Sequence, residues 1–331
     1  MIFMALGTAF FLAWSLGRNN LSNLFGPAIG TRMLPFQSSV LFAAVFVVLG
    51  AICSGTATTQ SVSDLGNVST ATQALAICLS AGLILIGLSH LGIPASITQT
   101  TTGAFVGWNI FYKYNLPTDL LIQTVSAWMY TPLVAGILAY LCFKLLQKLL
   151  KKHPIKLLLR DKIIRYGLLT VGIFSSYALG ANNVGSIIGP FMHLETKSPE
   201  MLFLSAGLAI AVGFCFADKK VIKTVSSGMF PLTPSEAFIV VFISALTLFL
   251  FSSVELKNIL LKLSLPTIPL VPVPLSGVSI GTIIGIAVAK GITGLKFKSA
   301  GKVICSWITA PVCAGVICYG ILSLFMLGGI K

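Results

Sequence analysis

One short polar phrase occurs twice in this chain, and its residue types suit the binding of a small ion. Both copies keep a glycine, two asparagines, a second glycine and a proline at the same spacing, namely Gly17, Asn19, Asn20, Gly26 and Pro27, then Gly180, Asn182, Asn183, Gly189 and Pro190. Amide side chains donate and accept hydrogen bonds, so they can bind the oxygens of an anion or a cation. The alternative is that these asparagines cap helices or bond neighbouring helices to each other.

The glycines and prolines of the phrase predict breaks in two membrane helices. A bilayer tolerates non-helical backbone only where that backbone is buried in protein or lines a cavity. A broken helix exposes free N–H groups that attract anions. Helix breakers at matched points of two hydrophobic halves are typical of a transporter binding site. We expect such breaks at Gly17, Gly26, Pro27, Gly180, Gly189 and Pro190.

A second polar cluster lies between Pro94 and Gly103. Hydroxyls and an amide without a carboxylate suit a desolvated oxyanion, whereas Thr101 and Thr102 could instead bond back to carbonyls of their own helix. The matched stretch in the second half, residues 272–281, is poorer in polar groups. The side chains expected at the site from these stretches are Ser96, Thr98, Gln99 and Ser276.

The composition is that of an integral membrane protein. Apolar residues make up 56% of the 331 residues and charged residues 9%, with mean hydropathy +0.97, against roughly 25% charged residues in soluble domains. The apolar runs are long enough for helices to cross a bilayer. We predict ten spans, at residues 1–16, 36–53, 72–90, 92–112, 120–146, 164–180, 200–217, 236–252, 271–290 and 302–328, with 92–112 broken or re-entrant.

The net charge of +14 does not indicate a nucleic-acid partner, because the Lys and Arg residues lie in the connections between spans. The connection between residues 144 and 165 is the most basic and is expected in the cytoplasm. Counting spans from it predicts a multi-pass protein of the cell membrane with the N-terminus and the C-terminus outside. The same connection could also contact anionic lipid of the bilayer as an amphipathic helix.

The repeat extends beyond the short phrase. The block from Trp128 to Gly136 matches the block from Trp307 to Gly315. We therefore predict an all-α fold of two five-helix repeats, at residues 1–150 and 166–331, joined by the basic connection 151–165. Because each half has an odd number of spans, the second half must be inverted relative to the first, which is an architecture of secondary transporters.

The sequence offers little for catalysis. We find no buried carboxylate pair, no Walker loop, no metal-ligand cluster and no convincing Ser/His/Asp order, so neither an enzyme nor an ATP-driven pump is expected, and no cofactor other than Na+ or H+ as a coupling ion. The seven cysteines lie in or beside apolar spans and are interpreted as small packing residues.

The doubled phrase, the Pro94–Gly103 cluster and the two Trp blocks resemble the inorganic phosphate transporter (PiT) family, which has relatives that carry sulfate. The segment 223–234 is also similar to that family. The resemblance covers nearly the whole chain apart from the large central loop of longer members. It implies an inverted-repeat, dimeric symporter that moves phosphate with sodium or protons.

This chain departs from the family pattern at charged positions. The family's Gly-Ala-Asn-Asp has Asn20 and Asn183 at the aspartate positions and Arg18 at one alanine position. The loss of two carboxylates puts sodium binding in doubt. One hypothesis is that Arg18 supplies the positive charge that sodium supplies in relatives. The alternative is that Arg18 reaches the cytoplasmic face as a topology anchor.

These residues predict a permease for a tetrahedral inorganic anion, phosphate first and sulfate second. Sulfate needs only donors, whereas protonated phosphate also needs an acceptor. A non-transporting scaffold or sensor of the same fold and a channel remain alternatives. The substrate-binding residues expected are Arg18, Asn19, Asn20, Ser96, Thr98, Gln99, Asn182, Asn183 and Ser276.

Overall fold

A computed structural model describes residues 1–152, 156–194 and 199–329, and these residues form helices and connections without strands. The first half contains α1 (Ile2–Leu24), α2 (Gly26–Gly30), α3 (Phe36–Ser54), α4 (Thr56–Ser63), α5 (Ala71–His90), α6 (Ile97–Tyr112) and α7 (Thr118–Lys152). The second half contains α8 (Leu157–Asn183), α9 (Gly185–Ile188), a 3₁₀ turn (Gly189–Phe191), α10 (Pro199–Cys215), α11 (Lys219–Lys223), a π turn (Thr224–Gly228), α12 (Pro234–Leu250), α13 (Val254–Lys262), α14 (Leu275–Ala289) and α15 (Phe297–Leu327). Residues 153–155 of the predicted basic connection lie outside the described residues.

The helix breaks coincide with only some of the predicted residues, namely Gly26 and Pro27 in the first copy. α1 ends at Leu24, and α2 begins at Gly26 with Pro27 in its first turn; in the second copy the chain turns at Val184. Proline lacks an N–H, so Pro27 cannot bond to the carbonyl four residues earlier. The prediction of breaks at Gly17 and Gly180 was wrong, since both lie inside long helices. In the first copy the break coincides with the proline, whereas in the second copy it precedes Gly189 and Pro190, which begin the 3₁₀ turn.

The two glycines have a packing role instead. A Cβ on Gly17 would lie 2.1 Å from the carbonyl oxygen of Ile210 in α10. A Cβ on Gly180 would lie 2.2 Å from the carbonyl oxygen of Val47 in α3. Glycine therefore lets α1 cross α10, and α8 cross α3, at backbone contact.

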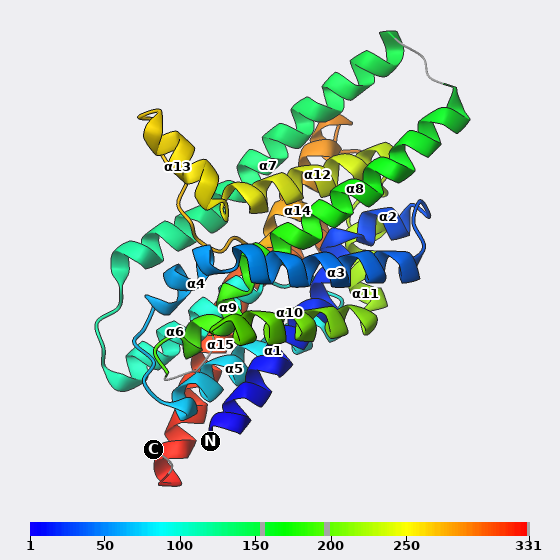
Figure 1. Cartoon of the computed structure of the whole chain (residues 1–331). Coiled ribbons are helices and arrows are strands. Elements are labelled where there is room, and N and C mark those ends of the chain that lie inside the picture. The colour runs from blue at the N-terminus through cyan, green and yellow to red at the C-terminus, as the bar shows by residue number, and fades with distance from the viewer. Residues whose placement is uncertain (153–155, 195–198, 330–331) are drawn as a thin grey trace.

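Two further pairs, each with one helix from either half, also pack through a glycine against a backbone carbonyl. Gly103 of α6 packs on the carbonyl oxygen of Pro311 in α15, while Gly281 of α14 packs on that of Pro132 in α7. Each half thus supplies one short helix to a long helix of the other half. Figure 1 shows the chain termini at one end of the bundle, and α7 and α8 extending together toward the opposite end.

The chain is a multi-pass membrane protein. Fewer of its described helices are long and apolar enough to cross a bilayer than the ten segments predicted. Five helical segments within the described residues are long and apolar enough to cross a bilayer, or seven if each of two bent pairs is one span. α14 has 15 residues, and α6 begins only at Ile97, after the non-helical residues 91–96. These two helices are short because each is preceded by an extended segment within its hydrophobic stretch.

Candidate functional site

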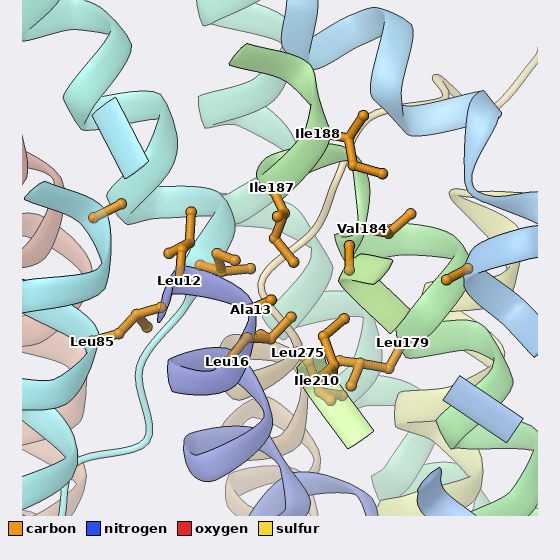
Figure 2. Packing of buried hydrophobic residues seen from close by; sticks show 14 of the residues in the cluster. Leu12, Ala13, Leu16, Leu85, Leu179, Val184, Ile187, Ile188, Ile210 and Leu275 are labelled. Carbon is orange, nitrogen blue, oxygen red and sulfur yellow. The ribbon is translucent and has the colours of Figure 1, made fainter. Parts of the chain in front are cut away.

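The elements that carry the two phrases meet in the interior of the bundle. Figure 2 shows Leu16 of α1, Leu179 of α8 and Leu275 of α14 gathered in the hydrophobic core. Asn20 follows Leu16 by one helical turn, and Asn183 follows Leu179 in the same way. Ser276 is the next residue after Leu275. α6 contacts α9 beside the second break, and α1 contacts α8, α9 and α14.

The first asparagine of each phrase holds the extended segment that precedes a short helix. The Ala95 N–H donates to Asn19 Oδ1 at 2.9 Å, and the Val273 N–H donates to Asn182 Oδ1 at 3.0 Å. Asn19 Nδ2 also donates to Ser89 Oγ at 2.6 Å and to the Ile93 carbonyl at 3.2 Å. Asn19 therefore fixes the entry to α6, and its amide is already fully engaged by the protein.

The second asparagine of each phrase is less committed to the protein. Asn20 Nδ2 donates to the Leu16 carbonyl at 3.3 Å, and Asn23 Nδ2 donates to Asn20 Oδ1 at 3.1 Å. Asn183 is 2% exposed, and its Oδ1 has no hydrogen-bond partner among the described residues. A buried polar atom left unpaired carries a cost of about 1–3 kcal/mol. Such an atom in the interior is consistent with a site that a solute completes.

The N-terminus of α6 is rich in buried hydroxyls. Ser96 caps the helix, with its Oγ accepting from the Gln99 N–H at 3.4 Å, and it lies 2.7 Å from Thr98 Oγ1. Thr100 bonds back to the carbonyls of its own turn, as expected of a helical threonine. Thr101 forms no such bond to its own helix, and its buried Oγ1 has no partner in the part of the chain that the structure describes.

The N-terminus of α14 is the second half's counterpart. It has no side-chain cap, and Ser276 Oγ is buried without a partner within residues 1–152, 156–194 and 199–329. Within the repeated phrase, two residues that sequence reasoning did not select share this property, since Asn23 Oδ1 and Ser186 Oγ also lack described partners. The other polar positions of the phrase could therefore have been chosen as candidates from the sequence.

Arg18 is paired instead of free. Its Nη2 lies 3.4 Å from Asp218 Oδ2, its side chain is 21% exposed, and the guanidinium lies 5.6 Å from the Trp14 ring centroid. The Asp218 N–H also donates to the Arg18 carbonyl at 3.1 Å. The sequence placed this aspartate in a connection, which the structure confirms. Because the carboxylate compensates the arginine, the geometry favours a structural role for Arg18 over replacement of a bound sodium.

We expect a double-mutant cycle on Arg18→Ala and Asp218→Ala to give a coupling of about 1 kcal/mol in the free energy of unfolding, the upper range for an ion pair with some solvent access. Denaturant unfolding of the detergent-solubilised protein would measure it. The pair Arg18→Ala and Glu255→Ala is the control, because Glu255 lies on a different helix next to Ser253, and its effects should add. Additive effects of Arg18 and Asp218 would contradict the pairing.

The buried centre is polar and nearly free of charge. In the described segments, its partnerless atoms include amide and hydroxyl atoms of Asn23, Thr101, Asn182, Asn183, Ser186 and Ser276, and the one charged group among the partnerless atoms is the Nε of Arg18. No group of three His, Cys, Asp or Glu side chains that could hold a metal occurs among the described residues. Neutral donors in a buried site can replace the water around an oxyanion without requiring a permanent positive charge.

Broken helices, short helices entering from extended segments and a buried polar centre define a membrane permease. The family follows from the sequence itself, since residues 16–259 match the PHO4 phosphate transporter family, and the chain belongs to that family. The sulfate permease CysP of Bacillus subtilis is 28% identical over 322 residues, covering 96% of this chain and 86% of that protein. A solved structure titled "The sodium-dependent phosphate transporter" has the same fold, with a TM-score of 0.80 at 18% identity, covering 98% of this chain and 99% of that chain.

Proposed function

We propose that this protein is a secondary transporter that carries a tetrahedral inorganic oxyanion by alternating access, with phosphate as the first substrate. The observation that carries the proposal is the set of buried polar atoms without described partners at the two helix breaks and at the N-termini of α6 and α14. A desolvated oxyanion would satisfy the hydroxyl and amide N–H donors of this set and be held by the dipoles of both short helices. The amide oxygens of Asn23 and Asn183 are acceptors and would pair with the hydroxyl of a protonated phosphate. Membership of the phosphate transporter family supports phosphate.

In this proposal the residues have different roles. Thr101 and Ser276 donate to the anion through hydroxyls that have no described partner, whereas Asn183 Oδ1, also without one, accepts from the hydroxyl of a protonated phosphate. Ser96, Thr98 and Gln99 complete the α6 side of the site, and Asn20 completes the α1 side. Asn19 and Asn182 hold the backbone that leads into the short helices, although the Nδ2 of Asn182 remains available, without a described partner.

Sulfate is the second candidate, and one feature favours it. No carboxylate is among the partnerless buried groups of the described residues, and Asn20 and Asn183 occupy the positions of the family's aspartates. A fully ionised sulfate needs only donors, whereas a protonated phosphate also needs an acceptor. The relation to a protein named sulfate permease supports this candidate.

Ion coupling and assembly belong to the same proposal. We take Na+ or H+ as the coupling ion, and the solved structure of similar fold is titled a sodium-dependent transporter. The matched close contacts at Gly17 and Gly180, and at Gly103 and Gly281, support two inverted repeats. A homodimer in the cell membrane, with both termini outside, completes the proposed arrangement.

Uptake into liposomes tests the proposal. Purified protein is reconstituted, and radiolabelled phosphate and sulfate uptake are measured side by side with sodium, with a proton gradient and with neither; empty liposomes are the blank. We expect saturable uptake of at least one of the two anions. Sodium-dependent phosphate uptake would support phosphate symport, and sodium-independent sulfate uptake would support the second candidate. Absence of uptake of both anions under all conditions would contradict a transporter and favour a scaffold or sensor.

A further inference from the structure

A pocket that shares no lining residue with the polar centre carries two arginines on an apolar floor, and we propose that it binds an anionic phospholipid of the surrounding bilayer through the headgroup phosphate. The pocket has a volume of about 670 Å³ and lies between the turn after α2, the start of α3 and the N-terminal part of α8. This inference goes beyond anion transport, since the lipid would be a bound component of the protein and not its cargo.

Arg32 is held in an unusual backbone conformation at the rim of this pocket. Its φ is 59°, in the left-handed region, which costs a non-glycine residue roughly 1–2 kcal/mol. The turn is fixed by the Arg32 N–H donating to the Ile29 carbonyl at 3.0 Å and the Met33 N–H donating to the Ala28 carbonyl at 3.0 Å. Glycine or asparagine would adopt this conformation at lower cost, so an arginine here is consistent with a role for its side chain.

Arg165 reaches the same pocket from α8. Its Nε donates to the Met33 carbonyl at 2.9 Å, which anchors the side chain against the turn that carries Arg32. Neither guanidinium forms an ion pair with a carboxylate of the described chain. Two uncompensated guanidinium groups on one pocket match the several oxygens of a phosphate group, which arginine binds through paired hydrogen bonds.

The rest of the pocket matches a lipid better than a soluble anion. Its floor and walls are largely apolar, from α2, α3 and α8, with Ile29, Leu34, Phe36, Phe42 and Leu169 among them. α3 and α8 both belong to segments long and apolar enough to cross the bilayer. Acyl chains can therefore follow these helices while the phosphate remains at the arginines.

The location also suits an anionic lipid. The pocket lies near the start of α8, whose first residues, 157–165, belong to the basic connection expected in the cytoplasm. Anionic lipids give the cytoplasmic leaflet a negative surface potential, which attracts basic residues close to it. Tyr166 also lines the pocket, and tyrosine is typical of the level of the lipid headgroups.

The test is lipid binding to the detergent-solubilised full-length protein, measured by native mass spectrometry during titration with palmitoyl-oleoyl phosphatidylglycerol. The first variant is Arg32→Asn, because asparagine tolerates the left-handed backbone and removes only the charged group. We expect the affinity of one tight lipid to fall about fivefold in Arg32→Asn and about 25-fold in Arg32→Asn with Arg165→Gln. Lys113→Asn is the matched control, since Lys113 is also exposed and left-handed, with φ 57°, at the end of α6.

Controls and competitors separate a bound lipid from a free anion and from general surface charge. Thermal unfolding of every variant checks folding, and Arg32→Asn alone decides the result if the double variant is unstable. Unchanged lipid binding in Arg32→Asn would overturn the proposal, and an equal loss in Lys113→Asn would reduce it to general surface charge. Glycerol 3-phosphate and inorganic phosphate are added as competitors. Displacement of the lipid by either at the same concentration would assign the pocket to a free anion instead.

Discussion

Replacing Asn183 with alanine should reduce phosphate uptake about 100-fold, because Asn183 Oδ1 would no longer accept a hydrogen bond from the protonated phosphate, a loss of roughly 3 kcal/mol. The side chain is 2% exposed, and its Oδ1 has no partner among the described residues, so it is available to the solute. The free energy of unfolding should change by no more than about 1 kcal/mol, because the variant removes a buried polar group that the protein does not satisfy. Initial uptake rates in liposomes and denaturant unfolding in detergent give the two quantities.

The matched control is Asn19→Ala, at the neighbouring position of the other phrase. Asn19 accepts from the Ala95 N–H and donates to Ser89 Oγ and the Ile93 carbonyl, so its loss leaves several buried groups without their partner. We expect this variant to lose about 3 kcal/mol of stability, at the upper end for broken buried hydrogen bonds. If Asn183→Ala were as unstable as Asn19→Ala, its amide would be structural; if it transported normally, Asn183 would not contact the solute.

The contrast between these asparagines shows what sequence could and could not predict. The doubled phrase marked the segment of each half in which a helix breaks and identified both pairs of asparagines as candidates. It could not separate them, because the partners of Asn19 and Asn182 are backbone groups at Ala95 and Val273, far along the chain. A side chain is structural where the fold brings such a partner to it, and it is available to a solute where the fold does not.

The same reason explains why sequence left the role of Arg18 open and why the break expected at Gly17 was wrong. The partner of Arg18, Asp218, lies 200 positions away in the sequence, so the ion pair could not be foreseen. Gly17 looked like a helix breaker because glycine both weakens helices and permits close helix crossings. Only the position of α10 against α1 decides between the two roles.

Hydropathy predicted which stretches are apolar better than it predicted where the helix within each stretch begins. The stretch 271–290 is continuous in hydropathy, yet its first residues are extended and only α14, from Leu275, is helical. Pro272 and Pro274 explain this, because a proline disfavours helical backbone at the residue before it. The hydrophobic pattern predicts which residues leave water, and the prolines decide where the helix begins.

The close crossing of α1 and α10 leads to the second large effect, a loss of about 3 kcal/mol of stability in Gly17→Ala, at the upper end for overpacking. The added Cβ would lie 2.1 Å from the Ile210 carbonyl oxygen and 2.9 Å from Gly213 Cα. Both are backbone atoms, so no side-chain rotation can relieve the clash and the two helices must separate. Denaturant unfolding in detergent measures the loss.

Gly7→Ala is the control in the same helix. No described atom of a neighbouring segment lies within 4 Å of a Cβ at Gly7, so alanine should be neutral or stabilise by about 0.5–1 kcal/mol through its higher helix propensity. Gly180→Ala should match Gly17→Ala, because its Cβ meets the Val47 carbonyl at 2.2 Å. Equal stability of Gly17→Ala and Gly7→Ala would mean that α1 can move away from α10 at little cost. In that case, this crossing would be a place where the bundle moves during transport and not a fixed contact.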